Sequence, residues 1–210
     1  MSFGWFFIPE KKYKRKFYMA ESLITKKAIA DSLKDLTKEK SFDKISVKDI
    51  SEKCGINRQT FYYHFVDKYD LLRWIYETEL LEVYLADVDF DNWRERFAAT
   101  LNMMKSEKRF YINTISHSED YLKRFMIEQG VTLFKRAIDE LDENSKVYKQ
   151  QREFIARFFT YGVCGIIIEW VLNNMQEEPE LIVENMWKLL VYCERAAYAH
   201  ITEEGELPGI

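Results

Sequence analysis

Hydrophobic positions recur at helical spacing in one segment after another from Glu21 onward. In the first segment, about residues 21–39, Ile29, Leu33 and Leu36 are separated by four and then three residues, which places them on one face of an α-helix. Further helices are predicted at about residues 46–54, 57–65, 67–86, 92–105, 107–116, 119–141, 147–175 and 179–202. No strand-like alternation interrupts them, so the pattern predicts an all-α protein of about nine helices.

A short turn joins the second and third of these helices. Ser46 is the expected N-cap of the second helix, with Asp49 three residues later in the capping-box position. Gly55 ends that helix where a left-handed backbone is tolerated. Asn57 then caps the third helix, whose Phe61 faces the core. A helix, a turn containing glycine and a second short helix together form the helix-turn-helix pattern.

The remaining face of the third helix carries side chains that suit DNA. Arginine and glutamine can form paired hydrogen bonds with purine edges, and tyrosine and threonine hydroxyls suit phosphate oxygens. Lys68 begins the fourth helix, and Lys44 and Lys48 flank the second, where their ammonium groups can reach the phosphate backbone. The residues of this face are Arg58, Gln59, Thr60, Tyr62, Tyr63 and His64. The same spacing also fits a solvated helix face whose tyrosines cover neighbouring core.

Four short blocks resemble the N-terminal domain of TetR-family transcriptional regulators. They read I-S-V-K-D-I-S at residues 45–51, C-G-I-N at 54–57, T-F-Y-Y-H-F at 60–65 and K-Y-D-L-L at 68–72. Their spacing follows the family pattern without a gap, although Ser51 and Cys54 stand where the family usually has small alanines. That departure is expected to affect helix packing more than function.

The resemblance implies a TetR-like fold, with a three-helix DNA-binding domain followed by a helical bundle. It implies that double-stranded DNA is the partner and gives each site residue a role. Base contacts are expected for Arg58, Gln59 and Thr60, and phosphate contacts for Ser46, Tyr63, His64 and Lys68.

Charge is divided unevenly along the chain. Residues 1–75 hold 16 Lys and Arg against 10 Asp and Glu, whereas the remaining residues hold 15 against 25. A basic first third joined to an acidic remainder indicates that only the first third meets a polyanion. We therefore predict a leader over residues 1–20, a DNA-binding domain over 21–68 and a regulatory and dimerisation domain over 69–210.

The leader places aromatic residues first and basic residues second. Residues 3–9 read F-G-W-F-F-I-P and residues 11–16 read K-K-Y-K-R-K, which reverses the order of a secretory signal. A basic arm along DNA and an aromatic plug on a membrane surface are two functional interpretations. The preferred interpretation is either a loosely ordered leader or an upstream start codon, with Met19 as the natural initiator.

The last two predicted helices carry apolar seams that one chain cannot easily cover. In the helix at 147–175 a seam formed by Phe154, Phe158, Tyr161, Gly165, Ile168 and Leu172 lies beside a second apolar face of Ile155, Phe159, Gly162 and Ile166. In the last helix Ile182, Met186, Leu189, Cys193 and Ala196 share one face. Both helices pairing with their symmetry mates would form a four-helix dimer interface, and a thick monomeric core is the alternative.

The predicted interface residues are Phe158, Tyr161, Gly162, Gly165, Ile168, Leu172, Met186, Leu189 and Cys193. Family resemblance agrees, since TetR-like proteins generally dimerise through their last two helices. Residues 19–26 and the run F-F-T-Y-G-V-C-G-I-I-I-E-W at 158–170 resemble a branch of the family that includes activators of dihydroxyacetone kinase operons.

Other classes of function find little support in the sequence. The polar cluster at residues 116–120, S-H-S-E-D, fits the end of one helix and the cap of the next better than a catalytic set. Three cysteines without metal spacing indicate neither a zinc module nor a disulfide framework, and no cofactor or metal is expected. The longest apolar run, residues 163–172, is interrupted by Glu169, so we expect a soluble cytoplasmic protein without membrane contact.

Regulation is where the sequence is least specific. A small-molecule effector or a protein co-regulator is expected for a TetR-like protein. Aromatic residues of the middle helices are candidates for an effector pocket, although core packing is the commoner role for such residues. They are Trp93, Phe97, Phe110, Tyr111, Tyr121, Phe125 and Phe134. The alternative function from another class is an all-helical protein-interaction module that has lost DNA binding.

Overall fold

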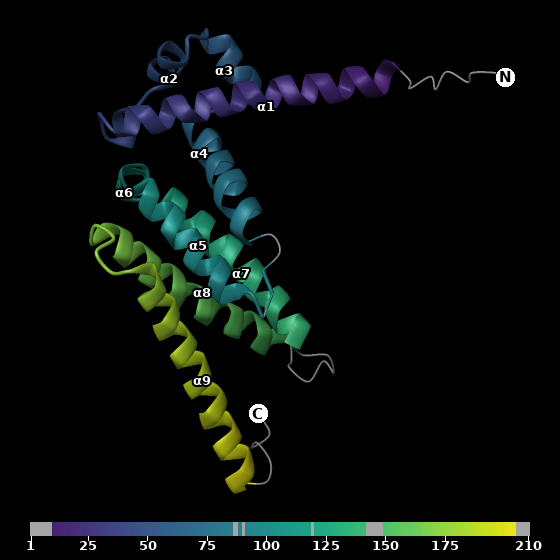
Figure 1. Ribbon diagram of the computed structural model, residues 1–210, viewed down its shortest axis with the longest axis vertical. Helices are drawn as coiled ribbons and strands as arrows, with labels where there is room; N and C mark the ends of the chain where they lie inside the picture. Colours follow the sequence, from purple (N-terminus) through teal and green to yellow (C-terminus); the bar gives the residue numbers. More distant parts are fainter. Residues whose placement is uncertain (1–9, 86–87, 90, 119, 142–148, 205–210) are drawn as a thin grey trace, which may run out of the picture. The chain divides into compact units, whose positions relative to one another are not determined.

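Nine α-helices make up most of the residues that the computed structural model describes, which are 10–85, 88–89, 91–118, 120–141 and 149–204 (Figure 1). They are α1 (Glu10–Thr37), α2 (Val47–Cys54), α3 (Arg58–His64), α4 (Lys68–Tyr76), α5 (Trp93–Ser106), α6 (Lys108–His117), α7 (Tyr121–Leu141), α8 (Lys149–Leu172) and α9 (Pro179–Glu204). A 3₁₀-helix, Phe42–Lys44, precedes α2, and a π-helix, Glu77–Leu85, follows α4. The described ranges contain no strand, so the all-α prediction is confirmed.

The chain divides into two compact units, Met1–Ile75 and Tyr76–Ile210. The predicted domain boundary after residue 68 falls at the start of α4. Leu71, Leu72 and Ile75 of α4 are fully buried and belong to the first unit. Most of α4 therefore completes the first unit instead of opening the second one.

The core of the first unit gathers apolar residues from every helix in it. Ile29 and Leu33 of α1, Phe42 of the 3₁₀-helix, Ile50 of α2 and Phe61 of α3 are all completely buried. Fully burying one such side chain contributes about 1.5–3 kcal/mol. This shared core fixes the angle between α2 and α3, and with it the face that α3 leaves exposed.

Helix α1 begins at Glu10, well before the start predicted near residue 21. Residues 10–20 are therefore helical rather than a loose leader, while residues 1–9 lie outside the described part of the chain. The run of basic residues at 11–16 interrupts the hydrophobic periodicity, so the periodicity did not predict this part of the helix. Lysine, arginine and glutamate are good helix formers, which accounts for the extension.

Ser51 of α2 occupies a position where the resembled pattern has alanine, and this difference affects packing. Ser51 is buried, and its hydroxyl has no hydrogen-bond partner among the described residues. A buried hydroxyl without a partner is unfavourable relative to the methyl group of alanine.

The second unit is built around the antiparallel pair α7 and α8. Gly130 of α7 lies directly against Thr160 of α8, so close that a Cβ at Gly130 would be 2.7 Å from the Thr160 Cγ2 atom. Thr160 is fully buried, and its hydroxyl donates to the carbonyl oxygen of Ala156 at 2.7 Å. The missing side chain at Gly130 therefore allows the two helices to approach.

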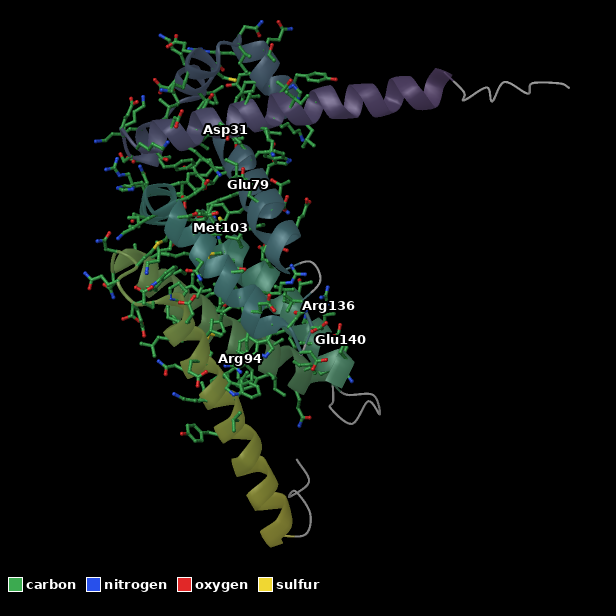
Figure 2. The ribbon with its side chains drawn as sticks, in the orientation of Figure 1. Asp31, Glu79, Arg94, Met103, Arg136 and Glu140 are labelled. Carbon is green, nitrogen blue, oxygen red and sulfur yellow. The ribbon has the colours of Figure 1, made fainter. Side chains whose placement is uncertain are left out.

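Polar contacts attach α9 to α5 in the second unit. The guanidinium of Arg94, which is labelled in Figure 2, lies 2.8 Å from a carboxylate oxygen of Glu184. Asn102 donates to Glu180 at 2.7 Å, and this hydrogen bond holds the pKa of the Glu180 carboxyl below its usual value. These contacts are exposed, so each contributes little, and the buried Ile182 and Val183 supply the apolar attachment.

The fourth helix changes its hydrogen-bonding pattern near its end. An α-helix continuing to about residue 86 was predicted, but the segment Glu77–Leu85 is π-helical. Apolar periodicity over so short a stretch does not distinguish i→i+4 from i→i+5 hydrogen bonding. At the junction, Tyr76 is buried and its hydroxyl lies 3.0 Å from the Thr114 hydroxyl on α6. Burial raises the pKa of Tyr76 well above its usual value.

Candidate nucleic-acid interface and apolar face

The corner between α2 and α3 is fixed by three local devices that the sequence predicted. Ser46 and Asp49 form the reciprocal capping box, with the Asp49 amide 3.2 Å from the Ser46 hydroxyl oxygen. Gly55 adopts the left-handed conformation at φ 73°, which only glycine enters without strain. The Asn57 side chain accepts a hydrogen bond from the Thr60 amide at 2.8 Å and caps α3.

Helix α3 buries one side and exposes the other, as a recognition helix must. Phe61 is buried, whereas Arg58, Gln59 and the two tyrosines that follow Phe61 are exposed. Tyr63 is 83% exposed, far more than a tyrosine that covers core. The face predicted to meet DNA is therefore open to solvent along the length of α3.

The lysine and arginine side chains near this face differ in whether they form ion pairs within the protein. Lys48 lies 3.7 Å from Glu52 across one helical turn, in a pair so exposed that a phosphate could displace it at little cost. Lys44 and Arg58 are exposed, and no ion pair to either occurs in the described residues. Lys40, which the sequence analysis overlooked, pairs with Asp49 at 2.9 Å and supports the capping box.

Two hydroxyls predicted to contact DNA are already used as donors. The Ser46 hydroxyl donates to Asp49 at 2.7 Å, and its backbone amide donates to the same carboxylate. These bonds and Lys40 hold the pKa of Asp49 far below its usual value. The Thr60 hydroxyl donates to the Asn57 side chain at 3.1 Å. Thr60 can then only accept, which fits a base amino group and not a phosphate.

His64 is half-buried at the C-terminal end of α3. Burial lowers its pKa, and the nearby charge of Lys26 lowers it further. At neutral pH the ring is uncharged and offers a single N–H donor to a phosphate. Lys26 itself lies over the rings of Phe65 and Trp74, at 5.3 and 5.7 Å from their centroids.

Lys68 is held by contacts within the protein. Its ammonium donates to the backbone carbonyls of Phe42, Asp43 and Ile45 at 2.8, 2.9 and 2.9 Å. An ammonium has three N–H donors, so all are used. It also lies 4.7 Å from the centroid of the Phe42 ring. Lys68 thus joins the end of the 3₁₀-helix to the start of α4, and its phosphate contact stays a prediction.

A second surface, which we call the apolar face, lies on α8 and α9. Its exposed large side chains are Phe154, Phe158, Tyr161, Ile166, Leu172, Leu181, Leu189 and Tyr192. Gly162 and Gly165 lie within it, and a Cβ on either would meet nothing within 4 Å. Of the predicted interface residues, Ile168 and Met186 are half-buried, and the Cys193 side chain lies outside the described residues.

The side of α8 that packs most deeply within the protomer is a third row of mostly small residues: Ala156, Thr160, Cys164, Ile167 and Val171 are all buried. The second predicted face packs in part, because Phe159 is half-buried and stacks on Phe134 of α7 at 5.8 Å. Alanine, threonine and cysteine give a weak hydrophobic signal, so the periodicity analysis passed over them. Both larger apolar rows are consequently left with exposed members.

The length and composition of residues Gln151–Leu172 alone would allow them to cross a membrane. Charged residues divide this segment, so its uninterrupted apolar runs are too short to predict a membrane span from the sequence. A third of its most apolar window is buried. Arg152 within it pairs with Asp139 of α7 at 2.6 Å. These contacts with α7 fit a helix that packs in a bundle and presents its other side to a partner.

Several aromatic candidates for an effector pocket pack in the core, and members of the polar cluster at residues 116–120 are buried or contact the backbone of their own helix. Phe110, Tyr111 and Phe125 are buried core residues, and the rings of Phe110 and Tyr111 meet edge to face at 5.2 Å. In the polar cluster, the His117 ring nitrogen Nδ1 lies 2.9 Å from the carbonyl oxygen of Asn113, a contact within its own helix. Ser118 is buried at the end of α6.

Models of two protein families match the two units separately. A model described as bacterial regulatory proteins of the tetR family matches residues 29–75, which run from the C-terminal third of α1 to α4. A model described as a transcriptional regulator C-terminal region matches residues 91–192, from the start of α5 into α9.

Individual relatives agree with these matches. The HTH-type dhaKLM operon transcriptional activator DhaS of Lactococcus lactis subsp. lactis (strain IL1403) is 28% identical over 157 residues, covering 74% of this chain and 84% of DhaS. The uncharacterized HTH-type transcriptional regulator YxbF of Bacillus subtilis (strain 168) is 22% identical over 174 residues, covering 77% of this chain and 43% of YxbF. This chain thus spans less than half of YxbF.

Solved structures show the same fold. The dihydroxyacetone kinase operon activator DhaS aligns with a TM-score of 0.64 at 26% identity, covering 81% of this chain and 96% of that one. The fatty acid degradation regulator FadR from Bacillus halodurans aligns with a TM-score of 0.56 at 14% identity, covering 79% of this chain and 94% of that one, and shows the fold alone.

Proposed function

The chain belongs to the TetR family of bacterial transcriptional regulators, and on that premise we propose that it binds a near-palindromic operator as a homodimer. It is a regulator rather than an enzyme, as its relatives are. The observation that carries the proposal is the open face of α3, which presents Arg58 and Gln59 beside two exposed tyrosines. Two such helices in a dimer can read half-sites about one turn, ~34–36 Å, apart.

Replacing Arg58 with alanine is expected to weaken binding to the preferred site by about 1–3 kcal/mol and to relax sequence preference. Arg58 is exposed at the start of α3, where side chains reach base edges in the major groove. The measurement is fluorescence anisotropy at ~0.15 M salt, on a duplex selected by the wild-type protein and on a scrambled duplex. Specific binding of this kind typically has a Kd of about 10⁻⁸–10⁻¹¹ M.

Arg109→Ala is the matched control, because Arg109 is an exposed arginine of the second unit. It should leave binding to both duplexes unchanged. Equal losses on both duplexes for Arg58→Ala would remove Arg58 from the base-reading set. Weak binding of the wild type to every duplex would instead favour the protein-interaction module.

The proposed dimer uses the apolar face of α8 and α9. Several large apolar side chains there are more than half exposed in a single chain, including Phe158, Tyr161 and Leu189. Large apolar side chains left exposed in this number are typical of a surface that a partner covers. The open space at Gly162 and Gly165 would let a partner helix approach closely. A second copy covers the face symmetrically, as a two-fold interface requires.

Replacing Gly165 with leucine is expected to shift the dimer toward monomer at micromolar concentration while the protomer stays folded. Within one chain the new side chain meets nothing within 4 Å of its Cβ, so only a partner can be obstructed. Sedimentation velocity measures the association and circular dichroism measures the helix content. Thr132→Leu, at an exposed position of α7, is the control that adds the same side chain elsewhere. An unchanged dimer would remove Gly165 from the interface.

The likeness to DhaS suggests which genes the protein controls. We propose that its operator lies at genes of dihydroxyacetone metabolism, and that a small molecule or a protein co-regulator sets its activity in the cytoplasm. Sequencing of chromosomal fragments retained by the purified protein tests this. Recovery of a dihydroxyacetone kinase operon is the expected result, and recovery of unrelated promoters alone would contradict it.

A further inference from the structure

The described part of α1 continues N-terminally far beyond the core that holds the helix in place. From Ser22 onward, where the side chains of α1 are described, the first completely buried residue is Ile29, yet the helix begins at Glu10. At 1.5 Å of rise per residue, the helix axis places residues 11–16 roughly 20–27 Å from Ile29. Figure 1 shows this half of α1 projecting past α2 and α3, within the same unit.

The projecting part is strongly basic. Five of the six residues at 11–16 are lysine or arginine, with Tyr13 as the exception. These five account for nearly all of the positive excess of the first 75 residues, in which 16 basic residues face 10 acidic ones. Without them, the helix-turn-helix and its surroundings would be close to neutral. The net positive charge of the first unit thus comes almost wholly from a segment outside the predicted recognition surface.

We propose that the basic extension of α1, residues 11–16, binds the phosphate backbone of duplex DNA flanking the half-site that α3 occupies. The inference rests on the proposed DNA binding and adds a second, sequence-independent contact to it. A helix of this length carries its charges over a distance equal to several base pairs beyond the helix-turn-helix. Charge complementarity selects a polyanion, and membership of the same unit as α3 selects the same DNA molecule.

Contacts with phosphates are detected by the salt dependence of affinity, whatever the DNA sequence. Each phosphate contact adds about 0.9 to the slope of log affinity against log salt. If two residues of each extension engage DNA, a dimer gains about four contacts, and its slope on long DNA steepens by ~3–4. The gain should vanish on a duplex that ends at the edge of the operator, because the extension then has no DNA to reach.

The experiment uses the full chain and two duplexes with the same operator, one trimmed to its edges and one extended by about ten base pairs on each side. The variant replaces Lys11, Lys12, Lys14, Arg15 and Lys16 with glutamine, which keeps helix propensity and removes charge. The control replaces five cations of the second unit with glutamine: Arg109, Lys123, Arg124, Lys135 and Lys188.

The expected result is that wild type and control have a steeper salt dependence on the long duplex than on the trimmed one, whereas the variant shows no difference. Wild-type binding to the trimmed duplex reports on the proposed function alone and should equal that of the variant. Equal wild-type slopes on the two duplexes would overturn the inference while leaving operator binding intact. A second result would also overturn the inference: the wild type, but not the variant, binds vesicles of anionic lipid, and the salt slopes on the two duplexes are equal. The extension would then bind a membrane surface.

Discussion

Replacing Lys68 with methionine is expected to lower the free energy of unfolding by about 3 kcal/mol. Methionine keeps most of the aliphatic stem but removes three charge-assisted hydrogen bonds to the carbonyls of Phe42, Asp43 and Ile45. Those carbonyls then lose the donor that joins the 3₁₀-helix to α4. Urea denaturation followed by circular dichroism measures the loss.

Lys48→Met is the matched control, because Lys48 has only an exposed pair with Glu52 and should change stability by less than about 0.5 kcal/mol. DNA binding separates the structural role of Lys68 from a phosphate role. A structural lysine leaves the salt dependence of the folded protein unchanged. Unaltered unfolding together with a salt slope shallower by ~1 for each protomer would support the phosphate contact.

Replacing Gly130 with leucine is expected to destabilise the second unit by about 3 kcal/mol or more. A Cβ there would lie 2.7 Å from Thr160 Cγ2, and Thr160 is completely buried with its hydroxyl bonded to Ala156. Neither partner can move without separating α7 from α8. Thermal unfolding monitored by circular dichroism measures the effect.

A double-mutant cycle tests whether the α7–α8 contact is the cause. Thr160→Ser keeps the hydroxyl but removes Cγ2, so the nearest remaining atoms to a new Cβ would lie 3.4 and 3.5 Å away. Gly130→Ala alone should destabilise, and Thr160→Ser should rescue it, because serine makes room for the methyl group. If Gly130→Ala alone stabilised by the ~1 kcal/mol of helix propensity, the close packing would be refuted.

Local sequence signals predicted the DNA-binding corner because each of its devices acts over a few residues. Ser46, Asp49, Gly55 and Asn57 cap or end helices through contacts no more than four residues away, and all were identified correctly. The helix order also followed from periodicity. The start of α1 did not, because the basic residues at 11–16 interrupt the periodicity. The π-helical turn after Tyr76 did not either, because periodicity over so short a stretch does not distinguish the two hydrogen-bonding patterns.

The sequence by itself determined the all-α class, the helix-turn-helix, the family and the residues on the outer face of α3. These follow from spacing and capping, which are properties of neighbouring residues. Only the tertiary structure decided what Lys68 does and which side of α8 is buried. Lys68 meets carbonyls more than twenty residues away, and α8 packs through Thr160 against a glycine on another helix. Such contacts depend on where distant segments meet, and no local pattern records that.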